Sequence, residues 1–109
     1  MAVTTERSTY RGQDADLTTA SARLLFTLLK ESGLSSYGAG NFTGSQAYTA
    51  LQGRVASEIG DTPDGKPIHL VFSKDEGNLA WRAVDHALMN TLRPSESLRA
   101  LESAFELCK

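Results

Sequence analysis

Residues 16–34, DLTTASARLLFTLLKESGL, decide the fold that this sequence predicts. Asp16 can cap a helix, because its carboxylate can accept hydrogen bonds from the free amides of a first turn. Gly33 followed by Leu34 is typical of a left-handed helix stop. Between these two signals, apolar residues recur at the three- and four-residue spacing of one helix face. They are Leu17, Ala20, Leu24, Leu25, Leu28 and Leu29. The pattern predicts a helix over 17–32.

The apolar face of this helix is wider than a surface helix needs. With Ala22 and Phe26 included, it covers about two thirds of the circumference, whereas a one-sided surface helix needs only slightly more than ~100°. We therefore expect burial on two sides, either at the centre of the chain's own fold or against a partner. On this ground Leu25, Phe26 and Leu29 are candidate protein-interface residues.

The glycine-rich stretch 34–44, LSSYGAGNFTG, predicts a loop. Its G-x-G-x-x-x-G spacing loosely matches a dinucleotide-binding turn, but that turn follows a strand and opens a βαβ unit, and neither is predicted here. A surface loop without a cofactor is therefore favoured. Exposed aromatic side chains on such a loop suggest protein contact, whereas aromatic side chains folded back would cover the core. Tyr37 and Phe42 are interface candidates on the first of these interpretations.

A second helix is predicted over 44–59, preceded by Thr43, which can form a capping box with Gln46. Gly53 lies inside this helix and costs about 1 kcal/mol relative to alanine. We expect it to mark the close approach of another backbone.

The turn-rich segment 61–67, DTPDGKP, is followed by one short strand predicted over 68–73. A lone strand leaves a row of unpaired backbone groups. It must therefore pair with the 2–10 segment, the 34–42 loop or a second chain, unless it is an extended connector covered by helices. Pairing with a second chain would make its apolar residues interface candidates: Ile68, Leu70 and Phe72.

Two further helices are predicted over 75–92 and 95–108. The first can begin with a Ser73–Glu76 capping box, although Gly77-Asn78 offers a second start, and the second has Pro94 in its first turn. Trp81 lies near the edge of an apolar face, where a tryptophan is either an interface hot spot or an edge-of-core residue. The expected fold is mainly α, with about four helices and one short strand. It forms one compact, bundle-like domain over 16–109, after a flexible polar arm over 1–15.

Composition argues against several classes of function. The 109 residues carry 11 Lys and Arg against 13 Asp and Glu, a net charge of −2, with no block of like charge. A nucleic-acid interface normally shows a basic face, so no direct nucleic-acid binding is expected. His69 and His86 have no neighbours at metal-ligand spacing, and Cys108 has no activating base. We expect no catalytic residue, no metal and no cofactor.

The chain also shows no secretory signal and no apolar run near the ~20 residues that span a bilayer, so a cytoplasmic location without membrane attachment is expected. The single cysteine, which cannot form an intramolecular disulfide, agrees with a reducing compartment.

The length, the acidic balance, the RLLFTLLK segment at 23–30 and the missing chemical motifs are together similar to small bacterial antiactivators that bind a LuxR-type quorum-sensing receptor. This resemblance implies a homodimer that masks the receptor's dimerisation surface and so prevents its binding to DNA. We therefore expect a small non-enzymatic regulatory protein that binds and inhibits another protein, such as a transcription factor, and forms a homodimer. A phage-type inhibitor of a host protein would share these features.

The alternative is a small helical DNA-binding regulator built on 17–32 and 44–59. Two features weaken it. The long predicted connection 34–44 exceeds a helix-turn-helix turn, and Arg54 is the only basic residue of the second helix.

Overall fold

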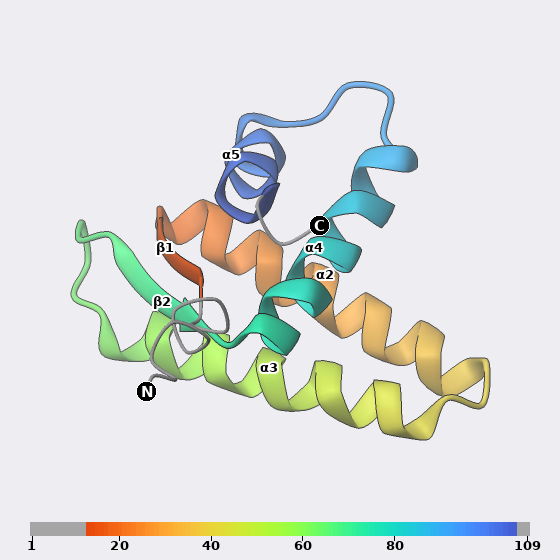
Figure 1. Ribbon diagram of the computed structural model, residues 1–109. Helices are drawn as coiled ribbons and strands as arrows, with labels where there is room; N and C mark the ends of the chain where they lie inside the picture. Colours follow the sequence, from red (N-terminus) through yellow and green to blue (C-terminus); the bar gives the residue numbers. More distant parts are fainter. Residues whose placement is uncertain (1–12, 107–109) are drawn as a thin grey trace, which may run out of the picture.

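The computed structural model describes residues 13–106, over which four helices and two strands are formed (Figure 1). In chain order they are β1 (Gln13–Leu17), α2 (Thr19–Gly38), α3 (Phe42–Asp61), β2 (Ile68–Phe72), α4 (Lys74–Met89) and α5 (Glu96–Phe105). The predicted mainly α single domain with four helices is confirmed. The prediction of only one strand was wrong.

The predicted strand at 68–73 finds its partner inside the chain. β2 pairs antiparallel with β1, so that Ala15 lies opposite Leu70 and Leu17 opposite Ile68. This partner is neither the 2–10 segment nor the 34–42 loop, because it lies at the junction of the predicted arm and the predicted first helix. Asp16, expected as a helix cap, belongs to β1. Residues 1–12 of the predicted arm lie outside the described residues.

The helix α2 occupies the centre of the fold. It packs most extensively against α3 and also contacts α4, α5 and β1. Leu25 and Leu29 are fully buried, and Leu24, Phe26 and Leu28 are partly buried against the same core. The wide apolar face of this helix is therefore covered by the chain's own elements, the first of the two alternatives that the sequence left open.

A tight turn over 39–41 joins α2 to α3. Gly40 has a φ of +84°, and its amide donates to the Tyr37 carbonyl at 3.0 Å. The Asn41 amide donates to the Ser36 carbonyl at 2.9 Å. These two hydrogen bonds form a Schellman motif, which satisfies the last carbonyls of α2. The Asn41 side chain then caps α3, so one helix ends and the next begins within three residues.

The predicted stop at Gly33 and the predicted 34–44 loop were both wrong, because most of that loop is helical. Gly33 lies inside α2 against α3, where an added Cβ would be 3.3 Å from the Cβ of Tyr48. It therefore allows two helices to approach closely. The close packing expected at Gly53 occurs here instead, since nothing among the described residues lies within 4 Å of a Cβ added at Gly53.

We predict different effects of alanine at these two glycines. Gly53→Ala is expected to raise the free energy of unfolding by about 0.5–1 kcal/mol, because alanine favours the helix, restricts the unfolded chain and meets empty space. Gly33→Ala is expected to bring no gain, because the new methyl group presses on Tyr48. Urea denaturation of both variants measures the difference. A lower unfolding midpoint for Gly53→Ala than for the parent protein would contradict it.

The last two helices begin close to their predicted positions. The Ser73–Glu76 capping box of α4 is confirmed in both of its hydrogen bonds. Ser95 caps α5, so Pro94 precedes the cap and does not lie in the first turn. The predicted ends at 92 and 108 were too late, since α4 ends at Met89 and α5 at Phe105. Cys108 lies outside the described residues.

The core lies where the two-stranded ribbon meets the helices. Phe72 of β2 and Phe105 of α5 are fully buried, with ring centroids 5.1 Å apart in an edge-on arrangement. Arg54 of α3 lies over Phe72, 5.8 Å from the ring centroid, and donates to the Val71 carbonyl and, at 2.5 Å, to Glu76 of α4. This arginine therefore ties α3 to both β2 and α4.

Candidate protein-binding surface

The interface residues predicted from the sequence divide into three groups. One group is fully buried in the core and out of reach of a partner in the folded chain: Leu25, Leu29, Ile68, Leu70 and Phe72. Phe26 and Trp81 are half-buried and pack against this core. Tyr37 and Phe42 are 63% and 56% exposed. Only this last pair is freely presented to solvent.

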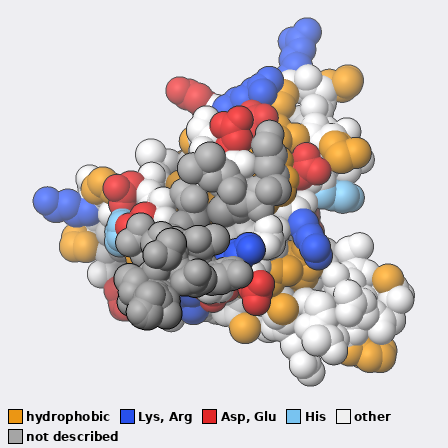
Figure 2. Space-filling view, viewed as in Figure 1, with side chains coloured by type: hydrophobic (Ala, Val, Ile, Leu, Met, Phe, Trp, Pro, Cys, Tyr) orange, Lys and Arg blue, Asp and Glu red, His pale blue; other side chains and the backbone are white. Residues whose placement is uncertain are grey.

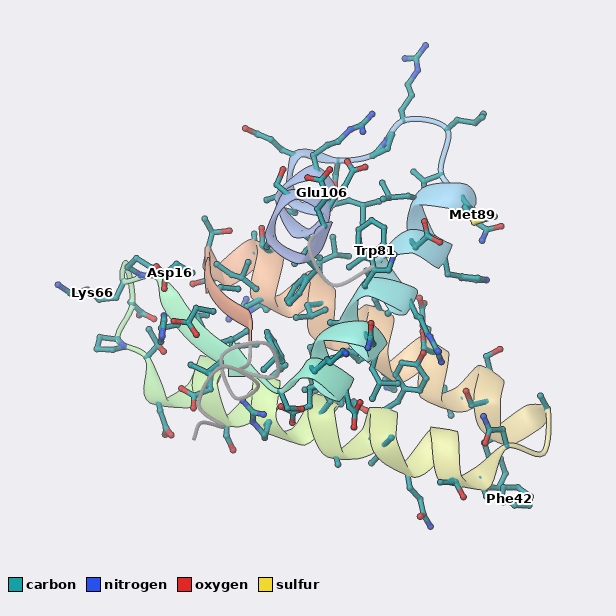
Figure 3. All side chains as sticks on the ribbon, in the orientation of Figure 1. Asp16, Phe42, Lys66, Trp81, Met89 and Glu106 are labelled. Carbon is teal, nitrogen blue, oxygen red and sulfur yellow. The ribbon has the colours of Figure 1, made fainter. Side chains whose placement is uncertain are left out.

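Tyr37 and Phe42 lie on the two sides of the turn 39–41, at the end of the α2–α3 hairpin. In Figure 1 this end projects beyond the other elements, and Figure 3 places Phe42 at its extremity. The two rings contact each other with centroids 5.1 Å apart. Leu34, one turn before Tyr37, is 65% exposed. We call Leu34, Tyr37 and Phe42 the apolar tip. The Schellman turn fixes both helices, so the tip is preorganised for binding.

The outer half of the hairpin carries no charge. Residues 32–53 contain no Asp, Glu, Lys or Arg, although 22% of the chain is charged and an average segment of this length would hold about five such residues. Figure 2 shows the corresponding lobe, at lower right, with hydrophobic and uncharged side chains only. Interface cores are depleted of charged residues and enriched in aromatic ones. The outer half of the hairpin therefore matches an interface core in its lack of charged residues and in its exposed aromatic rings, although not in its four serines and three alanines.

This uncharged run is visible in the sequence, and sequence reasoning missed it. The prediction divided the segment between a loop and the start of a helix, so its two halves were never joined. Leu34 was missed for the same reason, because it was interpreted as the apolar residue that follows a helix stop.

A shallow groove of about 370 Å³ runs between α2 and α3 beside the apolar tip. Gly33 is buried in its floor, where the two helices approach closely. Among residues 13–106, its lining comes from these two helices alone: Lys30, Gly33, Leu34, Tyr37, Ser45, Thr49 and Gln52. Lys30 is the one charged residue among these seven. We call this feature the hairpin groove.

A larger cleft of about 500 Å³ opens between α2 and α4. Arg82, His86 and Asn90 come from the α4 side, and Glu31 with several serines from the α2 side. Tyr48 lies at its base, where burial raises the pKa of the phenol and the nearby Arg82 partly offsets the rise. Within residues 13–106, the His86 ring lies within hydrogen-bond distance of the Asn90 side chain, with Nε2 3.4 Å from Nδ2. This contact does not align a base with a nucleophile.

His69 lies on the solvent face of the ribbon, between the buried residues Ile68 and Leu70. Its Nδ1 atom is 2.6 Å from the Asp16 carboxylate, and this hydrogen bond is the main cause that raises the pKa of the imidazole. Both side chains are more than half exposed, so the pair is a cross-strand surface contact between β1 and β2.

The geometry of residues 13–106 bears on metal sites, membrane-spanning helices and dinucleotide-binding turns. No group of three or more His, Cys, Asp or Glu side chains gathers there in a way that could hold a metal ion. No helix in this range has the length and apolar character needed to cross a bilayer. In the glycine stretch, Gly38 and Gly44 are helical and only Gly40 lies in the turn, so no strand precedes it as a dinucleotide-binding turn requires.

No protein-family model matches the chain, and no curated protein or solved structure is significantly similar to it.

Proposed function

We propose that this protein is a cytoplasmic, non-enzymatic regulator that binds and inhibits another protein through the end of its α2–α3 hairpin. The observation that carries the proposal is the uncharged outer half of the hairpin with its exposed apolar tip. Apolar surface left in water forgoes about 25 cal/mol per Å² of stabilisation, and exposed apolar clusters on single domains often mark interaction sites. Aromatic side chains such as Tyr37 and Phe42 are also the usual anchors of binding hot spots.

The partner we propose is a transcription factor whose dimerisation the protein blocks. The resemblance to antiactivators of LuxR-type receptors favours this partner class. A projecting pair of helices is suited to blocking dimerisation, since helices pack against helices through ridges and grooves. Such a pair can occupy the place that a helix of the second receptor subunit takes in the receptor dimer.

The sequence also predicted a homodimer, on the ground that the wide apolar face of the first helix and the single strand needed a second chain to cover them. The fold removes both reasons. The wide apolar face of α2 is covered by α3, α4, α5 and β1, and β2 is paired with β1. Both features are accommodated inside one chain. The oligomeric state stays a prediction, which sedimentation at high protein concentration measures directly.

The charge distribution favours a protein partner over nucleic acid. The affinity of a protein for a nucleic-acid backbone comes mainly from lysine and arginine side chains, and residues 32–53 contain none. Arg54 of α3 is engaged with Glu76 and the Val71 carbonyl. The short turn 39–41 removes the objection that the connection is too long for a helix-turn-helix. However, α2 and α3 lie side by side as an antiparallel pair in Figure 1, whereas helix-turn-helix pairs cross at about 90–120°.

Affinity capture from native lysate tests the proposal. The double substitution Tyr37→Ser with Phe42→Ser is expected to lower the yield of the captured partner at least about tenfold, because a hot-spot side chain contributes about 2 kcal/mol or more to binding. Both positions are exposed, so the double variant should stay folded, which circular dichroism checks. Quantitative mass spectrometry measures the yield.

The control is Leu92→Ser, which removes a still more exposed apolar side chain from the α4–α5 connection. This control should capture the partner as the parent protein does. Undiminished capture by the double variant would refute the assignment of the tip, and an equal loss in the control would point to a general effect of surface polarity.

A further inference from the structure

We propose that the hairpin groove receives one amphipathic helix of the partner, whose apolar stripe contacts the apolar tip and whose carboxylate faces Lys30. This inference rests on the proposed function and names the chemistry of the partner segment. Four observations carry it: the groove faces away from the core elements, its walls are helical, its outer end is apolar, and its single charge is positive.

The groove lies on the face of the hairpin that the other described elements leave open. On α3, Ser45, Thr49 and Gln52 line the groove at helical spacing. Arg54 comes two residues later, a rotation of about 200° around the helix, and reaches the opposite way to β2. On α2, Leu28 lines the α4 cleft and comes two residues before Lys30, so the same rotation separates the two faces. A partner can therefore approach the groove without displacing α4 or β2.

The walls of the groove select a helix over an extended strand. A strand binds by adding to a sheet edge, where backbone donors and acceptors are free. The backbone groups of α2 and α3 are already bonded within the helices, and the turn bonds over 35–41 satisfy the ends. A partner segment in the groove can therefore contact only side chains and the backbone at Gly33. Each helix has 20 residues, about 30 Å, so several turns of a partner helix fit alongside.

Charge complementarity identifies the polar part of the partner helix. Lys30 is exposed, and no carboxylate forms an ion pair with it among residues 13–106. The neighbouring Glu31 lies towards the α4 cleft. A carboxylate on the partner would meet the ammonium group, and a lysine or arginine would be repelled. A second copy of this chain would present another Lys30 and an uncharged tip, so it is the poorer fit.

Two synthetic helical peptides of 18 residues test the proposal. Both carry the same leucine stripe at i, i+3, i+4 and i+7. The residues flanking the stripe are glutamate in one peptide and lysine in the other. NMR titration should show amide shifts within 30–37 and 42–52. At low salt the acidic peptide is expected to bind about fivefold more tightly than the basic one, and this preference should shrink as salt rises.

Charge-reversal variants sharpen the test. Lys30→Glu is expected to remove or invert the preference for the acidic peptide. Lys66→Glu makes the same charge change in the turn at the other end of the molecule, far from Phe42 in Figure 3, and should leave the preference intact. Equal affinity of both peptides, an unchanged preference in Lys30→Glu, or shifts confined to the α2–α4 cleft would overturn the proposal.

Other outcomes separate this inference from the proposed function. Concentration-dependent shifts of the same residues without any peptide would identify a second copy as the occupant, and would overturn the proposal. Capture of the cellular partner can depend on Tyr37 and Phe42 even if the two peptides bind equally well, or bind only at the α2–α4 cleft, or if Lys30→Glu leaves the preference unchanged. In that case the proposed function stands and the acidic-helix inference fails. If capture is independent of the tip, the proposed function fails first.

Discussion

Replacing Leu25 and Leu29 together by aspartate is expected to unfold the protein. Both side chains are fully buried in α2, the helix that contacts α3, α4, α5 and β1. Truncating a buried leucine costs about 2–5 kcal/mol, and placing an unpaired carboxylate in the core costs several more. Two such changes exceed the 5–15 kcal/mol stability of a typical domain. Loss of the helical circular dichroism signal and of a cooperative urea transition measures the effect.

Leu34→Asp is the matched control on the same helix. Leu34 is 65% exposed, so this variant should change the free energy of unfolding by no more than about 0.5 kcal/mol. A well-folded Leu25→Asp, Leu29→Asp protein would contradict the central position of α2. These leucines would then again be candidates for the protein interface.

Phe72→Ala is expected to cost about 3–5 kcal/mol of stability, the usual range for truncation of a fully buried phenylalanine. The substitution removes the edge-on contact with Phe105 and the ring under Arg54, so it loosens the junction of β2 with α5 and α3. Thermal or urea denaturation measures the loss. The neighbouring Val71 is 47% exposed and points to the other face, so Val71→Ala should cost less than about 1 kcal/mol. Equal costs at both positions would contradict the register of β2.

Local signals in the sequence were enough for most of the helices. The apolar periodicity of 17–29 located α2, the alternation of 68–72 located β2, and Ser73 with Glu76 located the start of α4. Each of these signals acts between residues a few positions apart. β1 gave a weaker signal, because the polar–apolar alternation of residues 14–17 is short and includes no β-branched residue. Its extended conformation depends on pairing with β2, more than fifty residues away in the chain.

Glycine misled the prediction because one residue type serves two purposes. Gly33 allows α3 to approach α2, and Gly40 takes the positive φ that ends α2. The sequence around Gly33 offered the stronger pattern, since a leucine follows it, whereas the true stop is marked by Gly40 with the cap residue Asn41. Only the packing of the two helices separates these roles.

The candidate surface was predicted in part. For Tyr37 and Phe42 the sequence left open whether the rings are exposed or folded back over the core; they are exposed, although on helices and not in a loop. The buried candidates were selected because apolar periodicity indicates that a face is covered. Periodicity does not say whether the cover comes from the same chain. For Leu25, Leu29 and the apolar residues of β2, it comes from the chain's own helices.

Amide hydrogen exchange of the protein, free and bound to its captured partner, tests the central claim most directly. Backbone amides at the end of the hairpin, within 34–49, are predicted to gain protection on binding, because we propose that the partner covers this uncharged segment. The strand β2 and the inner part of α2 around Leu25 are predicted to show the same exchange in both states, since they are already buried. A footprint on α4, α5 or the ribbon, with none within 34–49, would contradict the account.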